Sequence, residues 1–203
     1  MSIVIVAALV VGFGGDGKEL ARTNCICEVS KSRGGWCNAC DLGYVAGVAI
    51  KSEMLFEALD AHGHHINIES MGCEECRKAI ASDGFCENCQ WGFVGKQLYH
   101  SKLTYYLAKG RPKSKSASSC STCKAHTGKP LWCESCKIGG VGNVAYADKG
   151  VFQSAAVEYD RLRQAVELSA KCEDCGVAFF MGTKCLKCNI SYKGGKKSPQ
   201  QGQ

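Results

Sequence analysis

The chain has 203 residues and a formal net charge of +6, and 16 of its residues are cysteine. This length allows one or two ordinary domains, and the positive charge alone would indicate an acidic partner such as a nucleic acid. Its one long apolar run, residues 3–13, is too short to span a bilayer as a helix, which needs about 20 residues. No transmembrane span is therefore expected.

The apolar run fits the hydrophobic region of a signal peptide, and Gly12-Phe13-Gly14 could be its cleavage site. No Lys or Arg precedes the run, since the first basic residue is Lys18. A buried β-strand is the alternative, because the run is rich in Ile and Val. We expect residues 1–24 to form an export signal, which would make the protein periplasmic or extracellular, with a cytoplasmic protein as the alternative.

The cysteines fall into four groups of the same design. In each group two closely spaced pairs are separated by nine residues, and successive groups begin 47 to 52 residues apart. The second to fourth groups use Cys-x-x-Cys twice, whereas the first begins with Cys-x-Cys. The groups are Cys25, Cys27, Cys37 and Cys40; Cys73, Cys76, Cys86 and Cys89; Cys120, Cys123, Cys133 and Cys136; and Cys172, Cys175, Cys185 and Cys188. No thiol is left over, and this self-similarity is the signature of a repeat array.

Two facing cysteine pairs supply the four ligands of a tetrahedral metal ion. We expect about four Zn²⁺ ions per chain, because a closed shell of four thiolates is the usual structural zinc site; iron fits the same geometry. Each cysteine group spans fewer than twenty residues, and a segment this short cannot bury enough apolar surface to fold without a bound metal ion. Because each zinc–tetrathiolate centre carries a charge of −2, four centres would change the formal charge from +6 to about −2. The basic composition then gives little support to a nucleic-acid partner.

The paired cysteines resemble those of zinc-ribbon and rubredoxin-like proteins. The resemblance covers the cysteine units, under half of the chain, and implies small metal-stabilised α+β modules without implying any particular activity. The chain departs from the usual pattern in two places. The first pair, Cys25-Ile26-Cys27, is one residue short, and glycine follows the second cysteine of a pair only at Cys175-Gly176.

A short strand and an amphipathic helix are predicted after each of the first three cysteine groups. The strands contain a glycine followed by a valine, at Gly43-Tyr44-Val45, Gly92-Phe93-Val94 and Gly139-Gly140-Val141. The helices are predicted at Lys51–His62, at Ser101–Lys109 and, capped by Asp148, up to about Ala170. The fourth group has no helix after it.

These elements predict four tandem Cys₄ zinc-ribbon-like modules, the first three each followed by an amphipathic helix. The modules are residues 25–66, 73–108, 120–170 and 172–192. Residues 109–119 contain Gly, Pro, Ser and basic residues and are predicted to be a linker. Residues 193–203 are polar and rich in Lys, Gly and Gln, and are predicted to be a disordered tail.

The expected function is a structural, scaffolding or protein-interaction role, because no arrangement of residues typical of catalysis is present. The first alternative is nucleic-acid binding by the basic linker and tail. The second is heavy-metal sequestration or thiol redox chemistry, since Trp36-Cys37-Asn38-Ala39-Cys40 and Trp132-Cys133-Glu134-Ser135-Cys136 are similar to the thioredoxin motif. In the other groups, however, Phe85 and Lys184 take the place of the tryptophan.

Histidines offer one further candidate site. His62, His64 and His65 lie close together in the sequence, and His126 follows Cys123 after two residues. Imidazole is a common metal ligand, so the first three could add a metal site. A polar loop is the preferred interpretation for them, and a supporting role beside the sulfur ligands for His126.

Overall fold

The computed structural model describes residues 25–113, 120–124 and 128–198. The predicted signal segment 1–24, residues 114–119 of the linker, His126 and residues 199–203 lie outside these ranges. The described residues form four copies of one α+β unit, arranged in the order helix, β-hairpin, third strand and helix, of which the fourth copy has no final helix. None of the helices in this described part is long and apolar enough to cross a membrane.

Each copy, called a repeat below, begins with a helix at its first cysteine pair. Repeat 1 contains α2 (Cys27–Arg33), β1 (Gly35–Cys37), β2 (Leu42–Val45), β3 (Val48–Ile50) and α3 (Glu53–Leu59). Repeat 2 contains α4 (Glu74–Ala81), β5 (Phe85–Cys86), β6 (Trp91–Val94), β7 (Gln97–Tyr99) and α5 (Lys102–Lys109). Repeat 3 contains α6 (Ser121–Lys124), β9 (Leu131–Cys133), β10 (Ile138–Val141), β11 (Val144–Tyr146) and α7 (Lys149–Ser169). Repeat 4 contains α8 (Glu173–Met181), β12 (Lys184–Cys185), β13 (Ile190–Lys193) and β14 (Lys196–Lys197).

The three predicted helices are present and begin at equivalent caps. The side chains of Ser52, Ser101 and Asp148 accept a hydrogen bond from the backbone N–H three residues later. Such capping satisfies one of the N–H groups that the first helical turn leaves without a partner. The helices at the first cysteine pairs were not predicted, because three of them have only seven to nine residues and one has four.

Two sheets include a strand from the segment that precedes their repeat. β4 (His64–His65) pairs with β7, and β8 (Arg111–Pro112) pairs with β11, both antiparallel. A short 3₁₀ helix, η1 (Ile68–Ser70), follows β4. The boundary predicted at residue 66 therefore falls after a strand that belongs to repeat 2, and the predicted linker contains a strand of the repeat 3 sheet. These segments pair through backbone hydrogen bonds, which the pattern of side chains in the sequence does not reveal.

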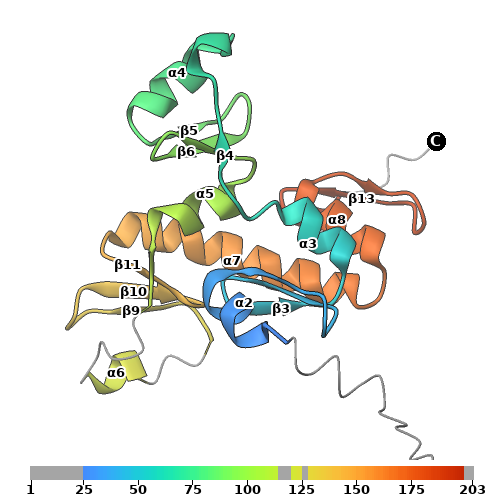
Figure 1. Cartoon of the computed structure of the whole chain (residues 1–203). Helices are drawn as coiled ribbons and strands as arrows, with labels where there is room; N and C mark the ends of the chain where they lie inside the picture. Colours follow the sequence, from blue (N-terminus) through green and yellow to red (C-terminus); the bar gives the residue numbers. More distant parts are fainter. Residues whose placement is uncertain (1–24, 114–119, 125–127, 199–203) are drawn as a thin grey trace, which may run out of the picture.

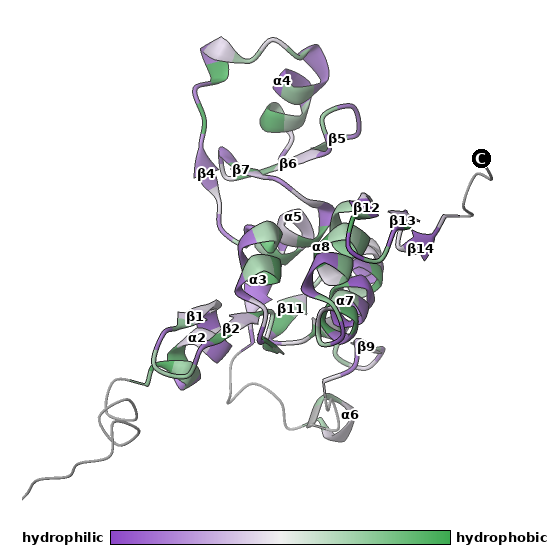
Figure 2. Ribbon diagram, turned by 90° about the vertical axis from the view of Figure 1, so that its right-hand side faces the viewer, coloured by the Kyte–Doolittle hydropathy of each residue, from purple (hydrophilic) through white to green (hydrophobic). Residues whose placement is uncertain are grey.

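Helix α7 is the centre of the molecule, packing against α5, α8, α3 and β10 (Figure 1). Its fully buried face includes Ala155, Leu162 and Ala165. One continuous core joins this face to buried side chains of repeats 1, 3 and 4 and to Leu103 of α5. In the view of Figure 2, α3, α5 and α8 lie above α7, and α4 with strands β4 to β7 of repeat 2 extends away beyond α5. The sequence predicted separate modules, and this shared core was not foreseen.

Repeat 2 has a core of its own. It consists of Cys76, Ala79, Ile80, Cys86, Phe93 and Leu98. Two of these six residues are members of a sulfur group. Burial of so few apolar side chains supplies little folding free energy, so repeat 2 depends on its cysteines more than the other repeats do.

The predicted disordered tail is corrected for residues 193–198. Strand β13 continues to Lys193 and turns back into β14, with Tyr192 opposite Lys197. The turn uses Gly194 and Gly195, both at positive φ, which glycine adopts without steric cost. Tyr192 is 4% exposed and its ring meets Phe179 edge to face. The hairpin is therefore anchored by one buried aromatic, despite the polar composition around it.

An aromatic pair enclosing a glycine recurs in the first three repeats. Across each hairpin an aromatic residue stands opposite a glycine, and an aromatic of the following helix packs over that glycine. The ring pairs are Trp36–Phe56, Phe85–Tyr105 and Trp132–Phe152, with centroids 5.3, 5.4 and 5.6 Å apart, around Gly43, Gly92 and Gly139. Repeat 4 has Lys184 opposite Ser191 and no helix to cover them. This contact explains the tryptophans of the two thioredoxin-like motifs as packing residues.

Replacing Gly92 with alanine should destabilise repeat 2, because the new methyl group would collide with the Tyr105 side chain. Overpacking of this kind typically costs about 1–3 kcal/mol. Urea unfolding of the metal-loaded protein measures the change. Gly72→Ala is the matched control, since nothing lies within 4 Å of a methyl group there. Equal stability of the two variants would contradict the proposed contact.

Candidate metal centres

The structure brings the cysteines together in the four groups expected from sequence, each within one repeat. In every group the four sulfur atoms lie within 4.8 Å of one another. All sixteen cysteines lie in the described part of the chain, and none of them forms a disulfide. These groups could hold about four metal ions per chain.

The sulfur–sulfur distances match the edge of a metal–thiolate tetrahedron. With Zn–S bonds of about 2.3 Å, neighbouring sulfurs lie about 3.8 Å apart. The Sγ atoms of Cys73 and Cys86 are 3.9 Å apart, those of Cys120 and Cys133 3.7 Å. In repeat 4 the Cys172 sulfur is 3.9 Å from Cys185 and 3.7 Å from Cys188. A metal ion therefore fits these groups without large movement.

The first cysteine pair of a repeat is positioned by the start of a helix. Cys73 and Cys172 are the N-caps of α4 and α8, and their partners Cys76 and Cys175 lie within the helix. A helix N-terminus presents unpaired N–H groups and favours negative charge. A hydrogen bond from the backbone of Cys76 lowers the pKa of Cys73 to about 7, and the backbone of Cys123 lowers that of Cys120 to about 6.

The second cysteine pair lies at the end of a strand and the turn that follows. The backbone N–H of Cys89, Cys136 and Cys188 donates to the sulfur of the cysteine three residues earlier, at 3.5, 3.4 and 3.4 Å. The next residues, Gln90, Lys137 and Asn189, have positive φ. This left-handed residue turns the chain into the second strand of the hairpin. The local geometry is thus repeated in all three groups.

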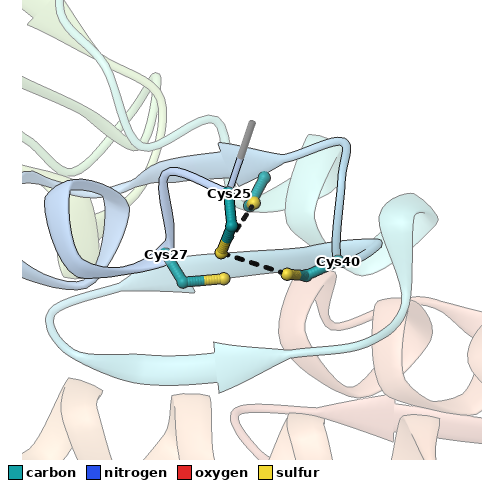
Figure 3. Close-up of side chains that lie close together, drawn as sticks. Cys25, Cys27 and Cys40 are labelled. Carbon is teal, nitrogen blue, oxygen red and sulfur yellow. Dashed lines mark hydrogen bonds between the residues drawn. The ribbon is translucent and has the colours of Figure 1, made fainter. Parts of the chain in front are cut away.

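Repeat 1 assembles its group although its first pair is one residue short. Helix α2 begins at Cys27 itself, with Ile26 as N-cap. The sulfurs of Cys25, Cys27 and Cys40 point toward one another (Figure 3), and that of Cys25 lies 3.2 Å from Cys40 and 4.0 Å from Cys37. Cys25 and Cys40 are exposed. The shorter pair changes the shape and solvent access of the group while keeping its four sulfurs together.

The thiols of a group cannot all ionise in the absence of a cation. Hydrogen bonds with Cys25, Cys27 and Cys37 raise the pKa of Cys40 to about 12. The pKa of Cys136 is likewise raised to about 12, first by Cys123 and then by the other thiols of repeat 3. Like charges at this distance disfavour each other. A bound divalent cation reverses this effect, because it stabilises the thiolates that coordinate it.

Two tyrosines support the sulfur groups of the outer repeats. The Tyr44 hydroxyl lies beside the Cys27 thiol. Burial, and then Cys185, raises the pKa of Cys175 to about 12, and the neighbouring Tyr192 hydroxyl opposes this increase. Burial, and then Cys175, raises the pKa of Tyr192 to about 12, so its hydroxyl remains a donor. The equivalent residues are Phe93 and Gly140 in repeats 2 and 3. Sequence inspection missed this pair, although both tyrosines occupy the same position of the repeat.

Replacing Cys86 with serine should remove one metal ion from the chain and leave the other three sulfur groups loaded. Each group is closed within its own repeat, so the loss stays local. Native mass spectrometry of the purified variant counts the ions. Asn88→Ala changes an exposed residue of the same turn and should retain the full number. Loss of two or more ions from Cys86→Ser alone would show that groups share ligands.

Replacing Tyr192 with phenylalanine should speed metal release from repeat 4. The hydroxyl stabilises the Cys175 thiolate, and loss of such outer hydrogen bonds typically weakens metal binding about 10–100-fold. Competition with a chromophoric chelator measures the release of individual ions. Tyr106→Phe, which removes a hydroxyl in α5, should leave the release rates unchanged. If all four ions leave Tyr192→Phe at the wild-type rates, the role given to this hydroxyl is contradicted.

Comparison of the chain with family models, with curated proteins and with solved structures finds no match. The likeness of its cysteine units to zinc ribbons and rubredoxins therefore rests on cysteine spacing and on the geometry of the four sulfur groups.

Proposed function

We propose that the chain is a structural zinc protein, in which four Zn²⁺ ions each hold one repeat together and the folded array serves as a binding surface for a partner protein. The observation that carries the proposal is the closure of all four sulfur groups within their own repeats. A closed four-thiolate shell leaves no position for a substrate or water, as structural rather than catalytic zinc sites do. Iron could occupy the same shell, and metal analysis distinguishes the two.

The separation of the groups favours a structural role over metal storage. Each cysteine belongs to one group only, whereas storage clusters gain capacity by sharing thiolates between ions. Helices and strands lie between successive groups and contribute to cores. A chain built for storage would have no need of this apolar packing.

Burial of the cysteines argues against thiol–disulfide catalysis. The third cysteine of each group would be the attacking thiol of a thioredoxin-like motif. These four residues, Cys37, Cys86, Cys133 and Cys185, are at most 2% exposed. A redox thiol has to be accessible to its substrate, so we propose that the protein is not an enzyme of this kind.

A protein partner is favoured over a nucleic acid by the placement of the aromatic rings. Trp36, Phe85 and Trp132 are engaged by helix aromatics and are therefore not available as a platform for base stacking. At the turn between the cysteines of its second pair, repeat 4 carries an apolar residue, Leu186, which is 84% exposed. The equivalent residues of the other repeats are Asn38, Glu87 and Glu134. We propose that this turn of repeat 4 is a contact point for the partner.

Export stays a prediction, since it rests on residues 3–13, outside the described part of the chain. An oxidising compartment would favour disulfides, and bound zinc would protect the thiols from that outcome. N-terminal sequencing of the protein from its host tests cleavage directly.

Substituting Leu186 by glutamate should abolish capture of the partner without changing the metal content. An exposed apolar side chain stabilises a complex when binding transfers it out of water. A carboxylate in its place would be buried at the interface without a partner of opposite charge. Affinity purification from the native host, with quantitative mass spectrometry, compares the variant with wild type. Asn38→Glu introduces the same charge at the matched position of repeat 1. A partner lost equally from both variants, or from neither, would contradict the assignment to repeat 4.

A further inference from the structure

Three histidines gather around one aspartate between repeats 1 and 2. Asp60 ends α3, and His62 and His64 follow it in the connection to repeat 2. His100 comes from the other side, between β7 and α5 of repeat 2. The metal-ligating atoms of Asp60, His62 and His64 all lie within 4.8 Å of one another. The neighbouring His65 does not belong to this cluster.

All three imidazoles meet the same carboxylate. His64 Nε2 lies 2.9 Å from Asp60 Oδ2, His100 Nδ1 lies 2.6 Å from the same oxygen, and His62 Nδ1 lies 3.3 Å from Oδ1. The His64 ring is sandwiched between the other two, with centroids 4.4 Å from His62 and 4.6 Å from His100. Three imidazole nitrogens and one carboxylate gathered this closely are donors that a single cation can share.

The backbone holds these side chains in place. His64 is paired with Leu98 in the sheet of repeat 2. Gly63 lies so close to this sheet that a methyl group there would come within 2.9 Å of the Tyr99 hydroxyl. Asp60 has a left-handed backbone, with φ of 45° and ψ of 57°, a conformation that aspartate and asparagine tolerate. A site built on paired strands and a fixed cap is preorganised for binding.

We propose that Asp60, His62, His64 and His100 form a fifth metal site, of different chemistry from the sulfur groups, for a divalent transition-metal ion such as Zn²⁺. Imidazole and carboxylate ligands suit this class of ion. Bonds of about 2.0–2.1 Å place neighbouring donor atoms about 3.3 Å apart. The imidazole nitrogens lie 2.6 to 3.3 Å from an oxygen of Asp60; His62 and His64 form the mutually close set with Asp60, and His100 reaches the site through its contact with that carboxylate. The side chains of His62 and His100 are 74% and 43% exposed, so an ion has access and the rings have room to adjust.

A bound ion would link the segment that follows α3 to repeat 2. Repeat 2 has its own core, and this site lies where the chain leaves the core shared by the other repeats. Occupancy would therefore restrain repeat 2 relative to helix α3. The site is independent of the proposed sulfur-bound zinc, because no cysteine contributes to it.

Native mass spectrometry of the full chain, titrated with Zn²⁺ beyond four equivalents, tests the proposal. Wild type should bind a fifth ion, and the variants His64→Ala, His100→Ala and Asp60→Asn should stop at four. Asp60→Asn retains a residue suited to the left-handed conformation. His65→Ala is the matched control, since it removes a histidine of the same strand outside the cluster, and it should still bind five.

A wild-type protein that stops at four ions would overturn the proposal, as would a fifth ion that survives all three variants. Protection of the sixteen thiols from alkylation is measured in the same samples. Protected thiols with no fifth ion would reject this site alone. Unprotected thiols would reject the structural zinc function, whatever the histidine cluster does. Imidazole ¹⁵N shifts of His64 and His100 should change as the fifth ion binds in wild type and stay constant in Asp60→Asn.

Discussion

The fold depends on four sulfur atoms meeting in each repeat. Helix starts and hairpin turns bring them within 4.8 Å, a distance at which four thiolates cannot coexist without a cation. The strands of a repeat have only two to four residues, and hairpins this small are marginal in water. A metal ion bound in each group would convert this unfavourable crowding of thiols into folding free energy, typically about 10 kcal/mol or more for a structural zinc site.

The sulfur groups alone do not set the architecture, because helix α7 of repeat 3 packs repeats 1, 3 and 4 around one core. Its buried face contacts helices from repeats 1, 2 and 4, and residues from all four repeats contribute to the surrounding core. The sulfur groups hold the hairpin within each repeat, whereas helix α7 determines how the repeats pack together. Repeat 2 touches the common core through α5 and otherwise has its own small core. It is therefore the part of the chain in which a bound metal ion would supply the greatest share of the stability.

The sequence predicted the local design of the molecule better than its assembly. The grouping of cysteines and the three helices after them follow from spacing, caps and periodicity, which are local properties. The short helices at the first cysteine pair of each repeat were not predicted, because four to nine residues are too few to show a helical periodicity of apolar residues. Strands β4 and β8 joined the next repeat through backbone hydrogen bonds, which side-chain patterns do not record. The cluster around Asp60 needed His100, a residue distant in the sequence, and only the fold places it there.

The most direct test of this account is hydrogen exchange of the full chain before and after complete removal of metal under reducing conditions. With thiols intact and metal gone, we expect the hairpins that carry the second cysteine pairs to lose protection in all four repeats, and repeat 2 to lose it throughout. Restoring Zn²⁺ should restore protection. A metal-free, fully reduced chain that keeps its native exchange pattern would contradict the central role given to the sulfur groups.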